Sequence, residues 1–487
     1  MNRFTRTAAL GTAFALGAAG LTGCDFTDGN DVDPNAATSA NADLLLNGGQ
    51  VGQILLQEGD FARLSGIFAG YFTGSDRQYA AFEQGRQNND DFNATWSVGY
   101  QETLAQLDLA LQAYEEAGNR TGAGIAKVHI ALAFGTLADL FGDIPYTQAL
   151  DAEQFENPAI DSQADVYAGV ISTLNEAIGD LNSGQGTINA ATELFYGTTV
   201  GPGFSSANIA TAYAQVANTL LGRYNLNIQD YAAAAAAAAN GISTPANNMV
   251  APHGGSLGSN VNQYYEFGVS DRGGYLTANG AFAVQLLSDS GDDLTDLSGL
   301  RDLYYDGPLA TADLNYADFF AFSAPFPIVT YAENQLILAE ARLLTGDQDG
   351  ALAALNSVRA DLNDQFITFE EDDDGTITDS TGFFAPYELS DFATGGVAND
   401  GTDSQGNALL RSILELKYAV LVGRIQGFTD VRRTDNFIGI PGKLGGRVPQ
   451  RFVYPRIEIN SNSNLSSGGP GPDTELPVFA SFSYTGV

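Results

Sequence analysis

One short motif in the sequence could carry nucleophilic chemistry. Gly254-Gly255-Ser256-Leu257-Gly258 matches the Gly-x-Ser-x-Gly pattern of a serine nucleophile held on a tight turn. That pattern needs a strand before the serine and a helix after it, whereas this motif lies in a glycine-rich stretch. The chain has only two histidines, His129 and His253, and its many acidic residues do not single out a catalytic pair by spacing. We therefore predict that the chain is not an enzyme.

An acidic stretch further along imitates a calcium-binding loop. Carboxylate and hydroxyl side chains alternate as in such a loop, but its first position is Glu and its last is Thr381 instead of a bidentate Glu. The candidate ligands are Glu370, Asp372, Asp374 and Thr376. A solvated acidic loop explains the same residues, so Ca²⁺ is a candidate only, and we expect no other cofactor because zinc and iron ligands are scarce.

The single cysteine, Cys24, lies directly after an N-terminal export signal. Arg3 and Arg6 precede an apolar stretch that is too short to cross a bilayer, and small residues lead to the cysteine. The run Leu21-Thr22-Gly23-Cys24 resembles a bacterial lipobox, in which the chain is cut before the cysteine and the cysteine is acylated. This predicts a lipoprotein signal peptide at 1–23, a lipidated N-terminus and polar tether at 24–40, and a single folded domain at 41–487. Several acyl chains on Cys24 would anchor the protein firmly to a membrane.

The charge balance excludes some partners. The chain has 58 Asp and Glu against 21 Lys and Arg, a formal net charge of −37. Such a surface repels nucleic acid and anionic lipid, so we expect neither as a partner. A halophilic protein, working in concentrated salt that screens this self-repulsion, is one explanation. An acidic extracellular protein at ordinary salt is the other.

Helical periodicity dominates from residue 41 onward. Helices are predicted at 96–114, 125–140, 163–182, 205–222, 228–240, 327–344, 348–362 and 409–422. Gly118, Asn225 and Gly346 should end or divide helices, and the stop Gly142-Asp143-Ile144-Pro145 should end another. Helix pairs of about 35 residues are typical of tetratricopeptide-type repeats. Long loops at 183–204, 241–278 and 364–408 separate the pairs, and strand-like pieces follow residue 447.

Several segments in order resemble the SusD/RagB family of outer-membrane nutrient-binding lipoproteins. After the lipobox and Asp33-Pro34-Asn35, these segments are Ala126–Ile144 with its LFGDIP turn, Ile328–Arg359, Ile413–Arg433 and Tyr454–Glu458. The family's usual Glu-Arg pair is replaced by Leu416 and Lys417, although Arg424, Asp430, Arg432 and Arg433 still fit a structural role.

The resemblance implies a fold and a function. The fold is mainly α-helical and SusD-like, with four tetratricopeptide-like helix pairs, long ligand-binding loops and minor β structure near the C-terminus. The protein would be lipid-anchored at the outer membrane, exposed at the cell surface, and would pass a captured oligosaccharide to a SusC-like TonB-dependent transporter. The alternatives are a peptide-binding lid of the same type, a surface-anchored glycan hydrolase, and a helical-repeat scaffold that binds only protein.

Capture of a sugar requires aromatic faces together with amide and charged side chains. Two segments, 71–96 and 262–275, are rich in both kinds of residue. The candidate ligand-binding residues are Tyr71, Arg77, Tyr79, Asn88, Asp90, Asp91, Trp96, Tyr264, Tyr265 and Arg272. The alternative for each aromatic residue is that it packs its loop onto the helices, and Trp96 at a helix start also fits a core position.

Overall fold

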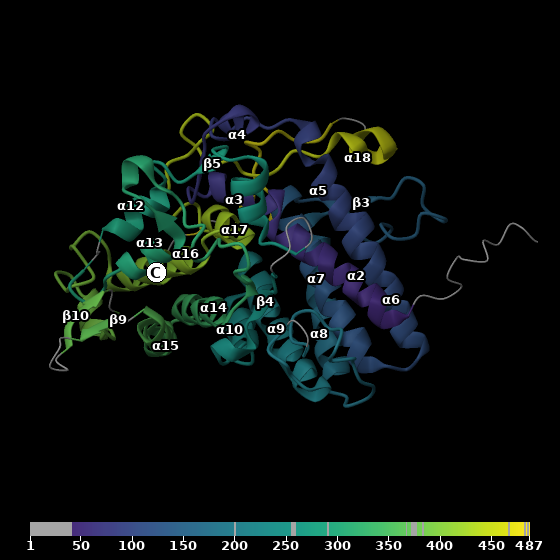
Figure 1. The fold of residues 1–487 in the computed structure, drawn as a ribbon, viewed down its shortest axis with the longest axis horizontal. Helices are drawn as coiled ribbons and strands as arrows, with labels where there is room; N and C mark the ends of the chain where they lie inside the picture. The colour runs from purple at the N-terminus through teal and green to yellow at the C-terminus, as the bar shows by residue number, and fades with distance from the viewer. Residues whose placement is uncertain are drawn as a thin grey trace, which may run out of the picture. The chain divides into compact units, whose positions relative to one another are not determined.

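Helices make up most of the structure, which confirms the predicted mainly α-helical fold. The computed structural model describes residues 41–198, 201–254, 260–289, 292–366, 368–371, 377–381, 384–465, 468–481, 484 and 487. The fold described below is that of the unit from Ala42 to Val487 (Figure 1). The predicted signal peptide, Cys24 and the tether lie outside the described residues and stay predictions.

Each of the eight predicted helices has a counterpart in the structure, which also contains helices that were not predicted. The α-helices are α2 (Ala42–Glu58), α3 (Asp60–Phe68), α4 (Arg77–Phe82), α5 (Asn93–Ser97), α6 (Ala105–Glu116), α7 (Arg120–Phe141), α8 (Gln163–Leu181), α9 (Ser206–Asn227), α10 (Tyr231–Ala238), α11 (Gln263–Tyr265), α12 (Phe282–Ser288), α13 (Ser298–Tyr304), α14 (Tyr331–Leu344), α15 (Gln348–Phe366), α16 (Gln405–Val420), α17 (Ile425–Arg433), α18 (Arg456–Ser461) and α19 (Pro477–Ala480). The short 3₁₀ and π segments are η1 (Asn89–Phe92), η2 (Val98–Leu104), η3 (Pro245–Asn247), η4 (Glu266–Asp271), η5 (Leu309–Thr311), η6 (Leu389–Phe392) and η7 (Ser463–Leu465).

Consecutive long helices pack against one another in the manner of tetratricopeptide-like pairs. Helix α2 packs on α6, α6 on α7, α7 on α8 and α8 on α9; further along, α10 packs on α14, and α14 on α15 and α16 (Figure 1). Helix α7 is the central element of the first group, because all but three of its residues are buried. It is long and apolar enough to cross a membrane, but 89% of its most apolar window is buried inside the protein, as is typical of a core helix. It ends at Gly142, whose φ of 81° favours glycine, as the predicted stop requires.

Several helix boundaries differ from the sequence prediction, and in two cases a single hydrogen bond explains the difference. Helix α9 continues through Asn225 to Asn227, because the Asn225 amide donates to the Leu221 carbonyl one turn earlier and is thereby satisfied inside the helix. The predicted helix at 327–344 begins only at Tyr331. Thr330 caps it by accepting a hydrogen bond from the Glu333 backbone N–H, and the preceding residues form a strand instead.

The strands are short and form antiparallel pairs. They are β1 (Thr73–Gly74) with β5 (Leu276–Thr277), β2 (Ile144–Pro145) with β3 (Ile160–Asp161), β4 (Met249–Ala251) with β8 (Phe326–Val329), β6 (Tyr305–Asp306) with β7 (Asp313–Leu314), and β9 (Thr368–Glu371) with β10 (Ile377–Thr381). The prediction of strand-like pieces after residue 447 was wrong. The described residues from 448 onward contain no strand. The Phe452 N–H donates to the Leu140 carbonyl at the end of α7 and the Val453 N–H to the Gln87 side chain, so this extended segment pairs with no strand.

A buried ionic network joins α14 to α17, consistent with the structural role expected of these arginines. Glu340 accepts hydrogen bonds from both terminal nitrogens of Arg433 at 2.7 Å, and Lys417 lies 3.4 Å from Glu340 and 3.0 Å from Asp430. Lys417, which replaces the family's usual arginine, therefore still supplies a positive charge here. The two arginine contacts and the charge of Lys417 outweigh burial and hold the pKa of Glu340 at about 2.

Candidate functional site

The two segments chosen from the sequence meet at one cavity. Strand β1, from the first segment, pairs with β5, which follows the second, and the Ser75 N–H donates to the Tyr275 carbonyl at 2.8 Å. Beside this pair is a cavity of about 350 Å³, which we call the β1–β5 cavity. Figure 1 shows α3, α4 and β5 gathered in this region. Its lining consists of Asp60, Arg63, Leu64, Gln78, Tyr79, Phe82, Asp91, Phe267, Asp271 and Arg272.

Arg63 is the centre of the cavity's polar floor. Its guanidinium donates to the Asp60 carboxylate at 2.6 Å, to the Tyr79 hydroxyl at 3.1 Å and to the Gln263 carbonyl at 3.2 Å. It also lies 4.3 Å from the centre of the Phe267 ring, within the range of a cation–π contact. Arg63 thus ties α3, α4, α11 and η4 into one rigid arrangement.

The charges of this floor are fixed at neutral pH. Burial raises the pKa of Asp60, but the charge and hydrogen bond of Arg63 outweigh burial and leave that pKa below its ordinary value. Burial raises the pKa of the Tyr79 hydroxyl. The floor therefore contains an ionised Asp60, a charged Arg63 and a neutral Tyr79, which can still exchange hydrogen bonds with hydroxyl groups.

Aromatic rings form one wall. The rings of Tyr79 and Phe267 are 4.8 Å apart, and Tyr275 lies 6.3 Å from Tyr79 and 6.4 Å from Phe267. Tyr79 is almost fully buried, whereas Phe267 and Tyr275 are half-buried and reach the surface. The wall therefore combines a fixed inner ring, Tyr79, with the more accessible ring of Phe267, and Tyr275 lies beside them outside the cavity lining.

Charged side chains stand at the rim. Arg272 is exposed, and its one side-chain hydrogen bond among the described residues goes to the Asp271 carbonyl at 3.0 Å, so further N–H groups remain for a ligand. Asp91 is half-buried, and burial raises the pKa of its carboxyl despite a hydrogen bond from the Asn88 N–H. Donors and acceptors thus surround an aromatic wall, which is the arrangement that binds a hydroxylated ligand.

Of the ten predicted ligand-binding residues, Tyr79, Asp91 and Arg272 line this cavity. Tyr71 and Tyr264 are fully buried instead. The Tyr71 hydroxyl donates to the Tyr418 carbonyl and that of Tyr264 to the Gly423 carbonyl, so both tyrosines pack the loops onto the α16–α17 region. For these two tyrosines, the alternative that an aromatic residue packs its loop onto the helices is therefore the correct one.

Four further candidates lie outside the cavity lining. Arg77 is exposed at the start of α4, and Asn88 caps η1 by accepting from the Asp90 N–H. Asp90 lies 3.4 Å from Arg456. Tyr265 is half-buried, with its ring 5.3 Å from that of Phe322. A direct ligand contact for any of them stays a prediction.

Trp96 lies at a second cavity of about 610 Å³, between α5, η2 and α18. Its indole N–H donates to Glu458 at 3.3 Å, and its ring is 4.8 Å from that of Tyr100. Because Trp96 is only 3% exposed, it offers a ligand little more than an edge.

The remaining predicted sites are only partly described. Glu370 lies in β9, while its side chain and the residues Asp372, Asp374 and Thr376 lie outside the described part. Residues 255–259 of the glycine-rich motif are also outside it. His253, just before that motif, forms a buried contact of 2.8 Å with Glu58.

Sequence reasoning missed Asp60 and Arg63, the centre of the floor. They are an oppositely charged pair three residues apart in the apolar helix DFARLSGIF. The sequence could have indicated them, because a charged pair inside an otherwise apolar helix needs polar partners and so marks a polar site.

Comparisons with known proteins agree with the predicted resemblance. Residues 34–248 match the sequence model of the SusD-like family, described as starch-binding and associating with the outer membrane. No curated protein matches the sequence. A SusD/RagB family protein from Bacteroides thetaiotaomicron has a TM-score of 0.64 at 18% identity, over 90% of this chain and 98% of its own.

Two other solved structures show the same fold. A SusD homolog from Parabacteroides distasonis gives a TM-score of 0.66 at 16% identity, over 90% of this chain and 98% of that one. A chitin-binding SusD homolog from Flavobacterium johnsoniae gives 0.62 at 15% identity, over 89% and 98%. The resemblance to the SusD/RagB family is therefore confirmed, by sequence over residues 34–248 and by fold over most of the chain.

Proposed function

We propose that this SusD-like chain captures an oligosaccharide at the outer membrane and passes it to a TonB-dependent transporter. The observation that carries the proposal is the β1–β5 cavity, where Tyr79, Asp91 and Arg272 meet the Arg63–Phe267 contact. The family description names starch as a ligand and one structural relative is chitin-binding, which supports a glycan as the ligand class.

Capture at this site needs no chemical step. A sugar ring has an apolar face that can lie against the half-buried Phe267, while its hydroxyl groups donate to Asp91 and accept from Arg272. Because Arg63 already holds Tyr79 and Phe267 in place, little side-chain freedom is lost when a ligand binds. The site therefore favours reversible binding.

The anchor would make the hand-off efficient. Acylation at Cys24 would confine the protein to the membrane surface beside a SusC-like partner, with the tether at 24–40 between them. Because both proteins would be held at the same membrane, each would be at a high effective concentration near the other, and a modest affinity would suffice for the complex to form. Surface exposure and this partner are part of the proposal.

Calorimetric titration with malto- and chito-oligosaccharides tests the ligand. Arg272→Ala and Asp91→Asn should each weaken binding about five- to tenfold, since each removes one charge-assisted hydrogen bond. The amide introduced by Asp91→Asn keeps an oxygen for the Asn88 N–H, so the cap of η1 survives. Arg447→Ala is the control, because it removes another exposed arginine that neither lines the cavity nor is a candidate ligand-binding residue.

The same protein separates the alternatives. Release of shortened sugars during incubation would show a hydrolase, and binding of peptides alone would show a peptide-binding lid. A transporter that co-purifies with a protein having no affinity for either ligand would show a scaffold. Wild-type affinity in both Arg272→Ala and Asp91→Asn would refute the assignment of this cavity.

A further inference from the structure

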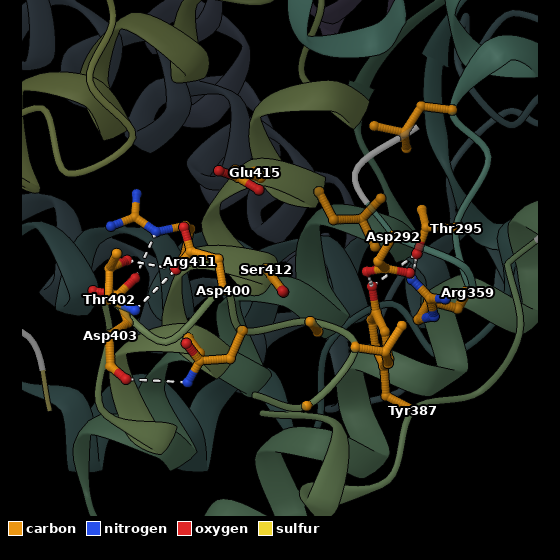
Figure 2. Close-up of a pocket in the computed structure, with 17 residues that line it drawn as sticks. Asp292, Thr295, Arg359, Tyr387, Asp400, Thr402, Asp403, Arg411, Ser412 and Glu415 are labelled. Carbon is orange, nitrogen blue, oxygen red and sulfur yellow. Dashed lines mark hydrogen bonds and ion pairs between the residues drawn. The ribbon is translucent and has the colours of Figure 1, made fainter. Parts of the chain in front are cut away.

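A further polar cavity, distinct from the β1–β5 cavity and from the cavity at Trp96, lies along helix α16. Its volume is about 300 Å³, and it shares no lining residue with the β1–β5 cavity. We call it the α16 cavity. Figure 2 shows Ser412 and Glu415 of α16 between the loop carrying Asp400 and Asp403 on one side and Asp292, Arg359 and Tyr387 on the other.

The arginines of this cavity are already engaged by the protein. Arg359 donates to the Ala385 and Leu294 carbonyls and to the Thr295 hydroxyl, and lies 3.7 Å from the centre of the Tyr387 ring. Arg411 donates to Asp403 at 2.8 Å and to the Phe437 carbonyl at 3.3 Å. Three N–H groups of Arg359 and two of Arg411 are therefore already used by the protein.

Acceptors, by contrast, remain available. Glu415 forms no hydrogen bond or ion pair with any described residue, although it is only partly exposed and lines the cavity. Asp400 uses one carboxylate oxygen, Oδ1, for the Thr402 N–H and hydroxyl, and Asp403 uses Oδ2 for Arg411. The other oxygen of each carboxylate has no such partner among the described residues, so a ligand must bring the donors.

The charges select the kind of donor. Four carboxylates line the cavity (Asp292, Asp400, Asp403 and Glu415) against two arginines, so its net charge disfavours an anion. The side chains of the described residues form no group of three or more that could hold a metal ion. A positively charged N–H donor satisfies both the acceptors and the charge.

We propose that the α16 cavity binds the ammonium group of a small organic amine, with the Glu415 carboxylate as its counter-ion. Asp400 and Asp403 face the same space from the loop before α16 and would accept the remaining N–H bonds. This site is independent of oligosaccharide capture at the β1–β5 cavity, because the two cavities have no lining residue in common.

Binding at this site is coupled to pH. Burial, opposed by Arg411 and reinforced by Asp403 and Asp292, raises the pKa of Glu415 to about 7. An ammonium group binds the ionised carboxylate, so amine affinity falls by up to about tenfold per pH unit below that value, and binding releases a proton. Above it, the affinity is level until the amine itself loses its charge.

A matched pair of probes, 1,4-diaminobutane and 1,4-butanediol, tests the proposal by calorimetry on the whole protein. The two probes have the same length and differ in charge. Sodium chloride at about 0.3 M screens weak binding to the acidic surface. We expect the diamine to bind one site at least about tenfold more tightly than the diol, because the charged donor forms the stronger hydrogen bonds.

Glu415→Gln supplies the second readout. This isosteric change leaves every hydrogen bond of the described residues intact, so the variant should fold; circular dichroism and unchanged oligosaccharide affinity verify this. It should weaken diamine binding at least about tenfold and abolish the pH dependence near neutrality. Glu116→Gln, an exposed acid on α6, is the control and should change neither.

Equal affinity for the diamine and the diol would overturn the proposal, since the site would then recognise hydroxyl groups. Absence of binding by the diamine would also overturn it. So would diamine binding that Glu415→Gln leaves unchanged, because the amine would then bind elsewhere on the acidic surface.

Discussion

Asp139, in the last turn of α7, should make the protein less stable as the pH rises. Its carboxylate oxygen Oδ1 accepts from the Tyr167 hydroxyl at 2.6 Å and from the Asn227 amide at 2.9 Å, while Oδ2 is buried without a partner among the described residues. Burial outweighs this hydrogen bonding and the positive charges of Arg223 and Arg432, and it raises the pKa of Asp139 to about 6.

The sign and size of the effect follow from that pKa. The folded value lies above the ordinary one, so the neutral carboxyl stabilises the native state at low pH, and this contribution is lost as the pH rises through about 6. A shift of roughly two units corresponds to about 2 to 3 kcal/mol between about pH 4 and about pH 8.

Asp139→Asn isolates this contribution. Asparagine keeps an oxygen for Tyr167 and Asn227 but cannot ionise, so its free energy of unfolding relative to wild type should increase by about 2 to 3 kcal/mol across that pH range. Urea unfolding at constant ionic strength measures the difference, and titrations elsewhere in the chain cancel because both proteins share them. Gly179→Ala in α8, which changes no titratable group, should give a pH-independent difference. A pH-independent difference between Asp139→Asn and wild type would refute the reasoning.

Three further predictions concern packing, the site and salt. A Cβ at Gly135 would lie 2.1 Å from the Tyr224 hydroxyl oxygen, so Gly135→Ala should lower the free energy of unfolding by about 1 to 3 kcal/mol. A Cβ at Gly179 in α8 meets nothing within 4 Å, so Gly179→Ala should raise that free energy by about 0.5 to 1 kcal/mol. Urea unfolding measures both changes. Arg63→Met should weaken oligosaccharide binding at least about tenfold in calorimetry because Tyr79, Phe267 and Gln263 lose their shared partner, while Arg447→Met at an exposed arginine outside the cavity should not. The urea midpoint should rise from low to molar NaCl because salt screens the net charge of −37, and a constant midpoint would contradict a halophilic origin of the acidity.

The helices could be predicted because each is specified locally. The apolar period of α7 and its Gly142 stop, and the break at Gly346 between α14 and α15, are written in consecutive residues. The boundaries that failed depended on single side-chain bonds. Asn225 reads as a breaker, and only its bond to Leu221 in the folded helix shows why α9 continues.

The candidate site could be predicted only in part because it depends on pairing between distant segments. Each of β1 and β5 has two residues, too few for any alternation to appear in sequence, yet their pairing brings the two aromatic-polar segments together. Tyrosine also has two roles that composition does not separate. Tyr79 lines a cavity, whereas Tyr71 turns its hydroxyl to the Tyr418 carbonyl inside the core.

The location of the cations makes the surface more acidic than the composition alone indicates. Of the 21 lysines and arginines in the sequence, two (Arg3 and Arg6) lie outside the described residues and eight are buried, namely Arg63, Arg223, Arg359, Lys417, Arg424, Arg432, Arg433 and Arg451. Several of them neutralise buried acids: Glu333 pairs with Arg223 and Arg424, and Glu340 with Arg433 and Lys417. A buried acid without such a partner would be driven toward its neutral form, as Asp139 is. Arginine thus stabilises the interior of this protein, and the cations left outside, such as Arg272 at the rim of the β1–β5 cavity, stand in a negative field that favours neutral ligands over anionic ones.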